Sequence, residues 1–220
     1  MKIVTESKNW VQYAEAVGDG NPMHRDNDYA KSKGLEGIIA PGMWVVSHVQ
    51  NTGQVCKAEF NFRDKVYDES VLDLASEGDK YVFGFGDKVV CDGVIGSRDY
   101  VDGKVKLPES FDHVYKCEVT SEDVGNFLES IFCPRGEGLP GMLFMSLSAP
   151  ALLSYAAKKS MVGIHASQSF EMYKPYEVGE LAVGVKSIKA GKRMHKLDLY
   201  WMQKDNIIGV GKAKVLPVVA

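Results

Sequence analysis

Apolar and polar residues alternate with a period of two in three separate segments of the chain. In an extended strand, this alternation places the apolar side chains on one face, against a core, and the polar side chains on the other. The alternating apolar positions are Ala58, Phe60 and Phe62, then Leu181, Val183 and Val185, and then Leu197, Leu199 and Trp201. The pattern predicts antiparallel strands in both halves of the chain.

A helical period occurs near the N-terminus. Trp10, Tyr13, Ala14 and Val17 lie at positions i, i+3, i+4 and i+7, which is the spacing of one apolar helix face. We therefore expect an amphipathic helix that begins after Thr5.

The segment that follows this helix, residues 18–26, reads Gly-Asp-Gly-Asn-Pro-Met-His-Arg-Asp. Its glycines and its Asn-Pro dipeptide predict a loop without regular secondary structure. Asp26, at the end of the loop, is expected to cap a short helix that ends at Gly34.

Two stretches of 20 residues, Gly37 to Cys56 and Gly138 to Ala157, contain no Lys, Arg, Asp or Glu. Their length would suit a membrane span. However, the first carries His48 and several amide and hydroxyl side chains, and the second carries three serines and two prolines. A protein interior can supply partners for these groups and hydrocarbon cannot, so we interpret both stretches as buried helices of a soluble core.

The two halves of the chain resemble each other at three places. Each match is short, but all three occur in the same order with slowly growing offsets. The matched segments are 41–44 with 140–143, 65–68 with 174–177, and 92–96 with 205–209. Duplication explains the order better than chance recurrence of Pro-Gly and Asp-Gly turns, which stays open as the alternative. Hairpin turns are expected at residues 91–93 and 204–206.

These elements predict an α+β fold in which each half runs as a short strand, a helix, a loop, a central helix and a meander of about four strands. The polar stretch from Lys106 to His113, with Pro108, marks the boundary. We therefore expect two units, residues 1–107 and residues 108–220.

Composition excludes several classes of protein. The chain of 220 residues has a net charge of −3, which argues against a protein that coats nucleic acid. Its four cysteines form no CxxC pair, as expected for unpaired thiols in a reducing compartment. The N-terminus has no apolar signal segment, so a cytoplasmic location is expected.

Candidate chemistry is concentrated in the loop at residues 18–26. It presents the carboxylate of Asp19 and the imidazole of His24, and Pro22 restricts both its own φ angle and the conformation of Asn21. A carboxylate and a histidine that converge on one water suit acid–base chemistry near neutral pH. Gly42 follows at the start of a predicted helix, where a free N–H could stabilise negative charge on a substrate carbonyl.

The residues alone leave another interpretation open. In an arbitrary protein, Asp19 and Asn21 would be turn residues and His24 a surface histidine. The remaining histidines have no partners at ligand spacing. We interpret His48 as a core or boundary residue, and His113, His165 and His195 as structural or solvent-facing.

The wider motif resembles the signature of the MaoC-like, or (R)-specific enoyl-CoA hydratase, family of hot-dog proteins. It consists of Gly18-Asp19-x-Asn21-Pro22-x-His24-x-Asp26, followed by Ala30, Gly34, Ile39-Ala40 and Gly42-Met43. The resemblance implies a tandem double hot-dog, in which each curved antiparallel sheet wraps a central helix. The implied activity is reversible hydration of trans-2-enoyl thioesters to (3R)-hydroxyacyl thioesters, with no metal or redox cofactor. The resemblance implies that Asp19 and His24 are the catalytic residues and that the Gly42 N–H binds the thioester carbonyl. It implies that Asn21 and Pro22 support the loop.

The chain departs from the family pattern at two places. Pro41 stands where the family often has histidine, and the second half offers Glu137 but no matching Asp/His loop. The second unit is therefore expected to be catalytically silent and to complete an internal pseudo-dimer. The expected partner is an acyl-CoA or acyl-carrier-protein thioester, with no nucleic acid and no membrane span. A further homo-oligomer, a (3R)-hydroxyacyl-carrier-protein dehydratase and a non-catalytic thioester-binding or structural subunit remain open, whereas the motif does not favour thioester hydrolysis.

Overall fold

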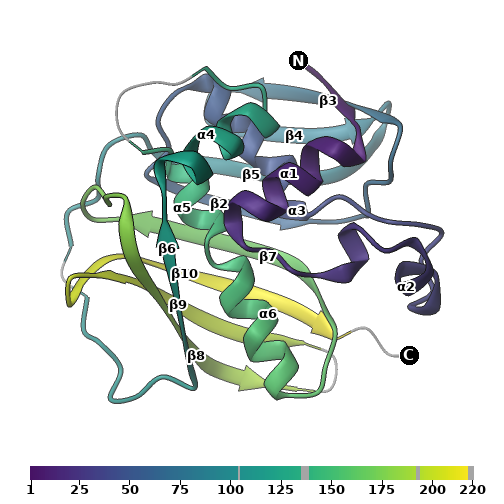
Figure 1. The fold of residues 1–220 in the computed structure, drawn as a ribbon. Helices are drawn as coiled ribbons and strands as arrows, with labels where there is room; N and C mark the ends of the chain where they lie inside the picture. The colour runs from purple at the N-terminus through teal and green to yellow at the C-terminus, as the bar shows by residue number, and fades with distance from the viewer. Residues whose placement is uncertain (104, 135–138, 192–193, 218–220) are drawn as a thin grey trace.

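A computed structural model describes residues 1–103, 105–134, 139–191 and 194–217 (Figure 1). The elements of the first half are β1 (Lys2–Thr5), α1 (Ser7–Val17), the 3₁₀ turn η1 (Pro22–His24), α2 (Asn27–Ser32), α3 (Gly42–Ser47), the 3₁₀ helix η2 (His48–Thr52), β2 (Lys57–Phe62), β3 (Ser70–Glu77), β4 (Lys80–Phe85) and β5 (Lys88–Ser97). Those of the second half are β6 (His113–Val119), α4 (Ser121–Ser130), α5 (Gly141–Ser146), α6 (Ala149–Lys158), β7 (Gly163–Met172), β8 (Gly179–Ala190), β9 (His195–Gln203) and β10 (Asn206–Pro217).

The ten named strands form a single antiparallel sheet in the order β1-β3-β4-β5-β2-β7-β10-β9-β8-β6. The order in the second half mirrors that in the first, so that β1 corresponds to β6 and β2 to β7. The halves meet where β2 pairs with β7, from Lys57 opposite Glu171 to Asn61 opposite Ser167. This mirrored order fits the duplication that the repeats predict.

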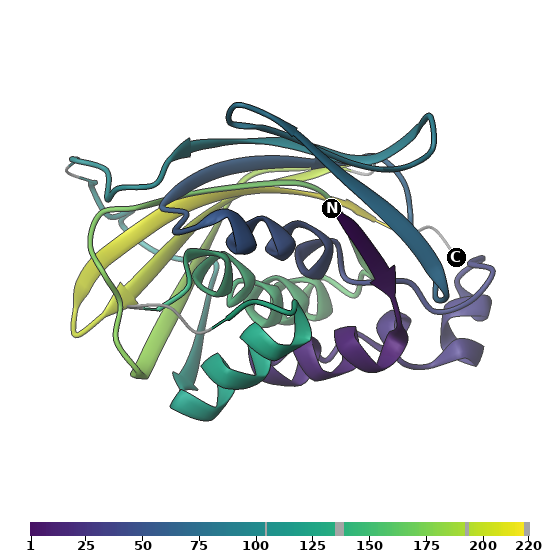
Figure 2. The ribbon, with the colours of Figure 1, turned by 90° about the horizontal axis from the view of Figure 1, so that it is seen from above.

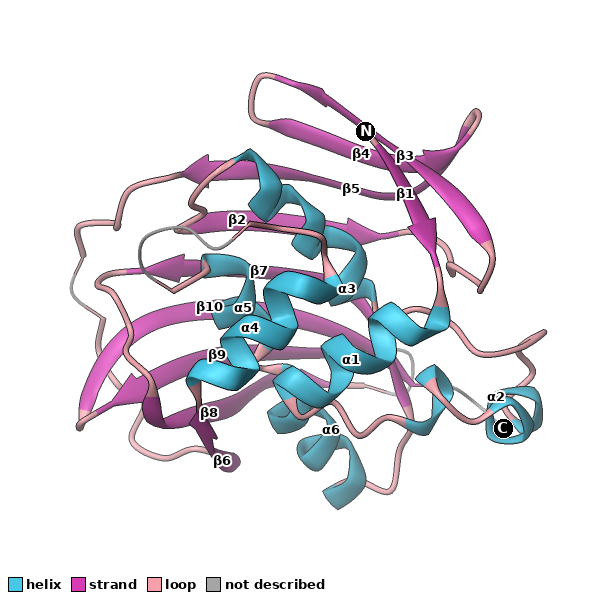
Figure 3. Ribbon diagram, turned by 45° about the horizontal axis from the view of Figure 1, so that its top comes forward, coloured by secondary structure: helices cyan, strands magenta, loops and turns pink. Residues whose placement is uncertain are grey.

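The sheet curves over the helices, which lie on one of its faces (Figure 2). Helices α3 and α5 lie beneath it near its centre, and α1 and α4 lie farther from the sheet, packed against each other (Figures 2 and 3). Trp44 of α3 connects the layers, because its ring packs edge-to-face on Trp10 of α1 and its indole N–H donates to the carbonyl oxygen of Ser130. The α+β architecture expected from the sequence, with a curved antiparallel sheet around central helices, is confirmed.

The side-chain periodicities predict the buried faces correctly. Ala58 and Phe60 of β2 are buried, as are the alternating residues of β8 and β9, and the four apolar positions of α1 are buried together. Asp26 caps α2 by accepting a hydrogen bond from the Tyr29 N–H (2.9 Å). The expected turn at residues 204–206 also forms, with left-handed φ angles at Lys204 and Asp205.

The turn expected at residues 91–93 is wrong, because these residues lie inside β5. A side chain on Gly93 would collide with the ring of Phe60 on the neighbouring strand, so this glycine permits a close approach between strands. The hairpins that flank β4 instead turn at Gly78 and Gly86, both with positive φ. The third repeat match is therefore out of register, since residues 92–96 lie within a strand and residues 205–209 begin at a turn.

Two further expectations are corrected. Strand β2 is not part of a simple four-strand meander, because it pairs with β5 and β7 rather than with β3. The central helices are also interrupted: η2 follows α3, and α5 and α6 separate at Leu147 and Ser148. Pro150 lacks an N–H to continue the α5 hydrogen-bond ladder, which accounts for the second break.

Candidate active site

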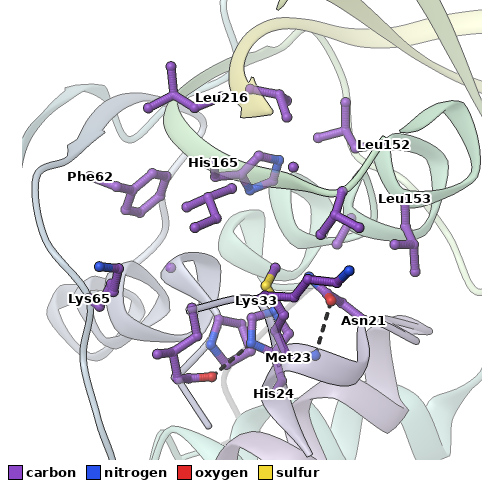
Figure 4. Close-up of a pocket in the computed structure, with 18 of the residues that line it drawn as sticks. Asn21, Met23, His24, Lys33, Phe62, Lys65, Leu152, Leu153, His165 and Leu216 are labelled. Carbon is purple, nitrogen blue, oxygen red and sulfur yellow. Dashed lines mark hydrogen bonds between the residues drawn. The ribbon is translucent and has the colours of Figure 1, made fainter. Parts of the chain in front are cut away.

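A cavity of about 760 Å³ lies between the two halves, at the ends of the central strands β2, β7 and β10 (Figure 4). The loop before α2, the start of α3 and the end of β2 form its wall on the side of the first half. Helix α6, residues 160–165 and the end of β10 form the facing wall. The exposed side chains of Arg63 and Lys65 line its outer part, whereas α6 contributes apolar side chains such as Leu152.

The end of α1 fixes the position of Asp19. Gly18 closes the helix in a left-handed conformation, and the Asp19 N–H donates back to the carbonyl oxygen of Ala14 (2.7 Å). One carboxylate oxygen, Oδ1, accepts the N–H of Asn21 (3.1 Å). The other oxygen, Oδ2, lies 3.7 Å from Nε2 of His24.

His24 is oriented by its second ring nitrogen. The carbonyl oxygen of Ile39 lies 2.8 Å from Nδ1 and can only accept, so Nδ1 carries the hydrogen. In the neutral ring, the lone pair is then on Nε2, which faces Asp19. Asp19 and His24 are only 6% and 8% exposed, and their 3.7 Å separation is longer than a direct hydrogen bond. Both groups can accept the two hydrogens of one water molecule.

Asn21 and Pro22 support the loop. The Asn21 side chain accepts the N–H of Met23 (3.2 Å), and Pro22 occupies the first position of η1. The loop was expected to lack regular structure, but this cap and the fixed φ of proline produce one turn of 3₁₀ helix. Outside the loop, the indole N–H of Trp10 donates to the His24 carbonyl oxygen (2.8 Å).

Gly42 begins α3 and lines the same cavity. Its N–H has no acceptor within the described part of the chain, as expected for the first turn of a helix. A Cβ atom on Gly42 would lie 2.9 Å from the ring of Phe62, so only glycine lets this ring lie against the helix start. The structure therefore brings Asp19, His24 and Gly42 to one cavity.

His165 also lines this cavity, contrary to the expectation of a structural or solvent-facing residue (Figure 4). Burial lowers its pKa to about 4, while Asp19 raises the pKa and His24 lowers it. The strand register explains why sequence patterns missed it. Between Lys214 and Val215 of β10, the pairing with β7 shifts by one residue, which places His165 opposite the buried Val215.

The other histidines take no part in the cavity. His48 is buried in the core, where its Nδ1–H is shared by the carbonyl oxygens of Trp44 and Val45, and burial lowers its pKa to about 4. His113 and His195 are not among the residues that line the cavity. Glu137, the carboxylate offered by the second half, lies outside the described residues.

The described residues contain no group of three or more His, Cys, Asp or Glu side chains that could hold a metal ion. Cys91 lines the cavity, and burial raises the pKa of its thiol well above the usual range, so this thiol stays protonated. All four cysteines are unpaired. No helix in the described ranges is both long and apolar enough to cross a membrane.

The family model described as "MaoC like domain" matches residues 2–56, the segment that contains Asp19, His24 and Gly42. The match covers about a quarter of the chain. The resemblance based on the loop motif is thus confirmed. No match is found among curated proteins.

Solved structures share the fold over nearly the whole chain. A MaoC-like dehydratase from Phytophthora capsici is 12% identical, with a TM-score of 0.64 over 100% of this chain and 95% of that one. A conserved hypothetical protein of Mycobacterium tuberculosis described as having a double hotdog fold is 11% identical, with a TM-score of 0.69 over 99% and 94%. An oleoyl thioesterase (putative) from Lactobacillus plantarum is 8% identical, with a TM-score of 0.58 over 100% and 95%. At these identities the likeness shows the fold alone, a double hot-dog.

Proposed function

We propose that this protein hydrates trans-2-enoyl thioesters to (3R)-hydroxyacyl thioesters, in a reversible reaction at a single site in each chain. The arrangement of Asp19 and His24 carries the proposal: two buried acceptor groups lie 3.7 Å apart and face a cavity that Gly42 also lines. The match to the MaoC-like domain and the likeness to a structure named as a dehydratase support hydratase or dehydratase chemistry.

In the proposed mechanism, Asp19 and His24 hold one water molecule by its two hydrogens. The water oxygen attacks C3 of the enoyl thioester while one of the two residues takes a proton. Electron density moves to the thioester oxygen, where the N–H of Gly42 stabilises it. A proton returned to C2 on the same face completes the addition of one water.

Asn21 and Pro22 keep their proposed role as supports of the loop. The second half would supply a wall of the acyl pocket and the partner sheet, without a second Asp/His pair. An apolar α6 wall suits an acyl chain, and the exposed basic side chain of Lys65 suits a polar, anionic carrier group at the outer end.

Hydration of crotonyl-CoA, followed by the loss of absorbance of the conjugated enoyl group, tests the proposal. Asp19→Asn and His24→Ala should each lower turnover by about 10²–10⁴-fold, because each removes a general acid–base group. His195→Ala is the matched control, since His195 does not line the cavity. Near-wild-type turnover in either cavity variant would remove the mechanism.

The same assay separates the alternatives when the carrier is varied. Activity on CoA thioesters supports the hydratase, and activity only on carrier-protein thioesters supports the (3R)-hydroxyacyl dehydratase. Inactivity on both would support a non-catalytic thioester-binding subunit. Release of free thiol without consumption of the double bond would indicate thioester hydrolysis instead.

A further inference from the structure

The C-terminal half contributes the imidazole of His165 to the cavity. A β-bulge in the pairing of β7 with β10 determines that this side chain points into the cavity. On β7, Gln168 pairs with the buried Ala213 and Ser167 pairs with the exposed Lys214. Regular pairing would continue with Ala166 opposite the buried Val215, which would leave His165 on the outer face. The register shift instead places His165 opposite Val215. Bulges of this kind redirect side chains next to functional sites.

The surroundings of His165 leave its hydrogen-bonding capacity unused. The ring stacks on Phe62, with the centroids 6.3 Å apart and the planes inclined by 17°. Apolar side chains that include Leu152 and Leu216 line the same cavity (Figure 4). No hydrogen bond within the described residues uses the half-buried imidazole, so its polar atoms are available to a ligand in the cavity.

His165 also faces the reacting groups. Asp19 and His24 act on its titration in opposite directions, and Figure 4 shows it across the cavity from His24. Burial keeps its pKa at about 4, so the ring is neutral near physiological pH and offers one N–H donor. A substrate that contacts His24 on one side therefore presents its other side to a neutral donor.

Phe62 connects this donor to the proposed carbonyl site. Gly42 lies against the Phe62 ring, and His165 stacks on the same ring. Gly42 and His165 thus contact the same aromatic ring from different halves of the chain. The carbonyl oxygen is the acceptor that an enoyl thioester carries beside its reacting carbons.

We propose that His165 is a second hydrogen-bond donor to the thioester carbonyl oxygen, which it binds together with the N–H of Gly42. The proposal rests on the proposed function and extends it, because it makes the catalytic site a composite of both halves. The C-terminal half then supplies a catalytic residue as well as a wall.

Binding of 4-(dimethylamino)cinnamoyl-CoA to the full chain tests this role without turnover. Hydrogen bonds to the carbonyl oxygen polarise this conjugated thioester and shift its absorbance to longer wavelength. His165→Leu should reduce the shift and lower kcat for crotonyl-CoA about 10²-fold, the usual cost of removing one oxyanion donor. His165→Gln retains a donor and should restore part of both signals.

His195→Leu serves as the control, because it also removes an imidazole but lies away from the cavity. A full absorbance shift and unchanged kcat in His165→Leu would overturn the assignment. If wild type hydrates crotonyl-CoA while His165→Leu behaves normally, only the role of His165 fails. If wild type neither binds the probe nor hydrates any thioester, the proposed function fails with it.

Discussion

At the scale of single residues, two histidines have the same depressed pKa in different settings. Burial lowers the pKa of both His48 and His165 to about 4, but His48 lies in the core and His165 lines the cavity. For His48, the ring Nδ1–H has carbonyl acceptors, while Nε2 is buried without a partner in the described part of the structure. Protonation of the buried His48 ring therefore lowers the free energy of unfolding.

The pH dependence of unfolding should report this cost. The unfolded chain binds a proton at His48 below its ordinary pKa of 6.5, whereas the folded chain binds it only near 4. Stability is therefore complete above the ordinary pKa and falls as the pH drops through 6.5 toward 4. Between about pH 7.5 and about pH 5, this one group should remove about 2 kcal/mol of unfolding free energy.

Urea unfolding of wild type and His48→Leu at both pH values measures the effect. The loss of stability between the two pH values should be about 2 kcal/mol smaller in the variant, because leucine does not titrate. Comparing each protein with itself removes any constant effect of the substitution. Equal losses in the two proteins would contradict a neutral, buried His48.

At the scale of elements, the repeated Pro-Gly-Met segments begin equivalent helices in different surroundings. Gly42 and Gly141 are the first residues of α3 and α5. A side chain on Gly42 would meet the ring of Phe62, which can move, but one on Gly141 would meet the backbone carbonyl of Val55, which cannot move without disturbing the start of β2. The Pro-Gly-Met segment therefore borders the cavity in the first half and packs within the core in the second half.

Replacement of two helix glycines by alanine should therefore have opposite effects on stability. Gly141→Ala should destabilise the protein by more than about 2 kcal/mol, because a core cannot accept the added atom without backbone shifts. Gly125→Ala, inside α4, should stabilise it by about 0.5–1 kcal/mol, since a Cβ there meets nothing within 4 Å. Shifts of the urea midpoint in opposite directions check both values, and similar shifts in one direction would contradict the packing argument.

At the scale of the whole molecule, the two halves share a sheet, a helix layer and a cavity. Strand β2 pairs with β7, α3 packs on α5, and α1 packs on α4. The cavity takes Asp19 and His24 from one half and α6 and His165 from the other. The division into a catalytic unit 1–107 and a silent unit 108–220 stays a prediction, but these contacts imply that neither unit is independent.

Expression of the two units separately tests this dependence. Each fragment exposes an unpaired strand edge at β2 or β7 and an apolar helix face, so we expect aggregation or partial unfolding of either fragment alone. Coexpression should restore a soluble complex and crotonyl-CoA hydration, measured as for the full chain. Full activity of residues 1–107 alone would contradict the composite cavity.

The sequence by itself determined the buried faces, the helix at residues 7–17, the caps, and the loop that holds Asp19 and His24. These features depend on neighbours within a few residues, which the local pattern contains. It also indicated the start of the helix at Gly42, because Pro-Gly marks that start locally.

The tertiary structure alone decided which strands are neighbours, why Gly93 lies within a strand, and where His165 points. Alternation assigns a residue to a face but not to a partner strand, and one extra residue in a bulge reverses the face for the residues beyond it. His165 therefore reaches the Asp19 and His24 pair only through a pairing with β10, about fifty residues farther along the chain. A contact made over that distance in sequence depends on the packing of the whole sheet, and no local pattern encodes it.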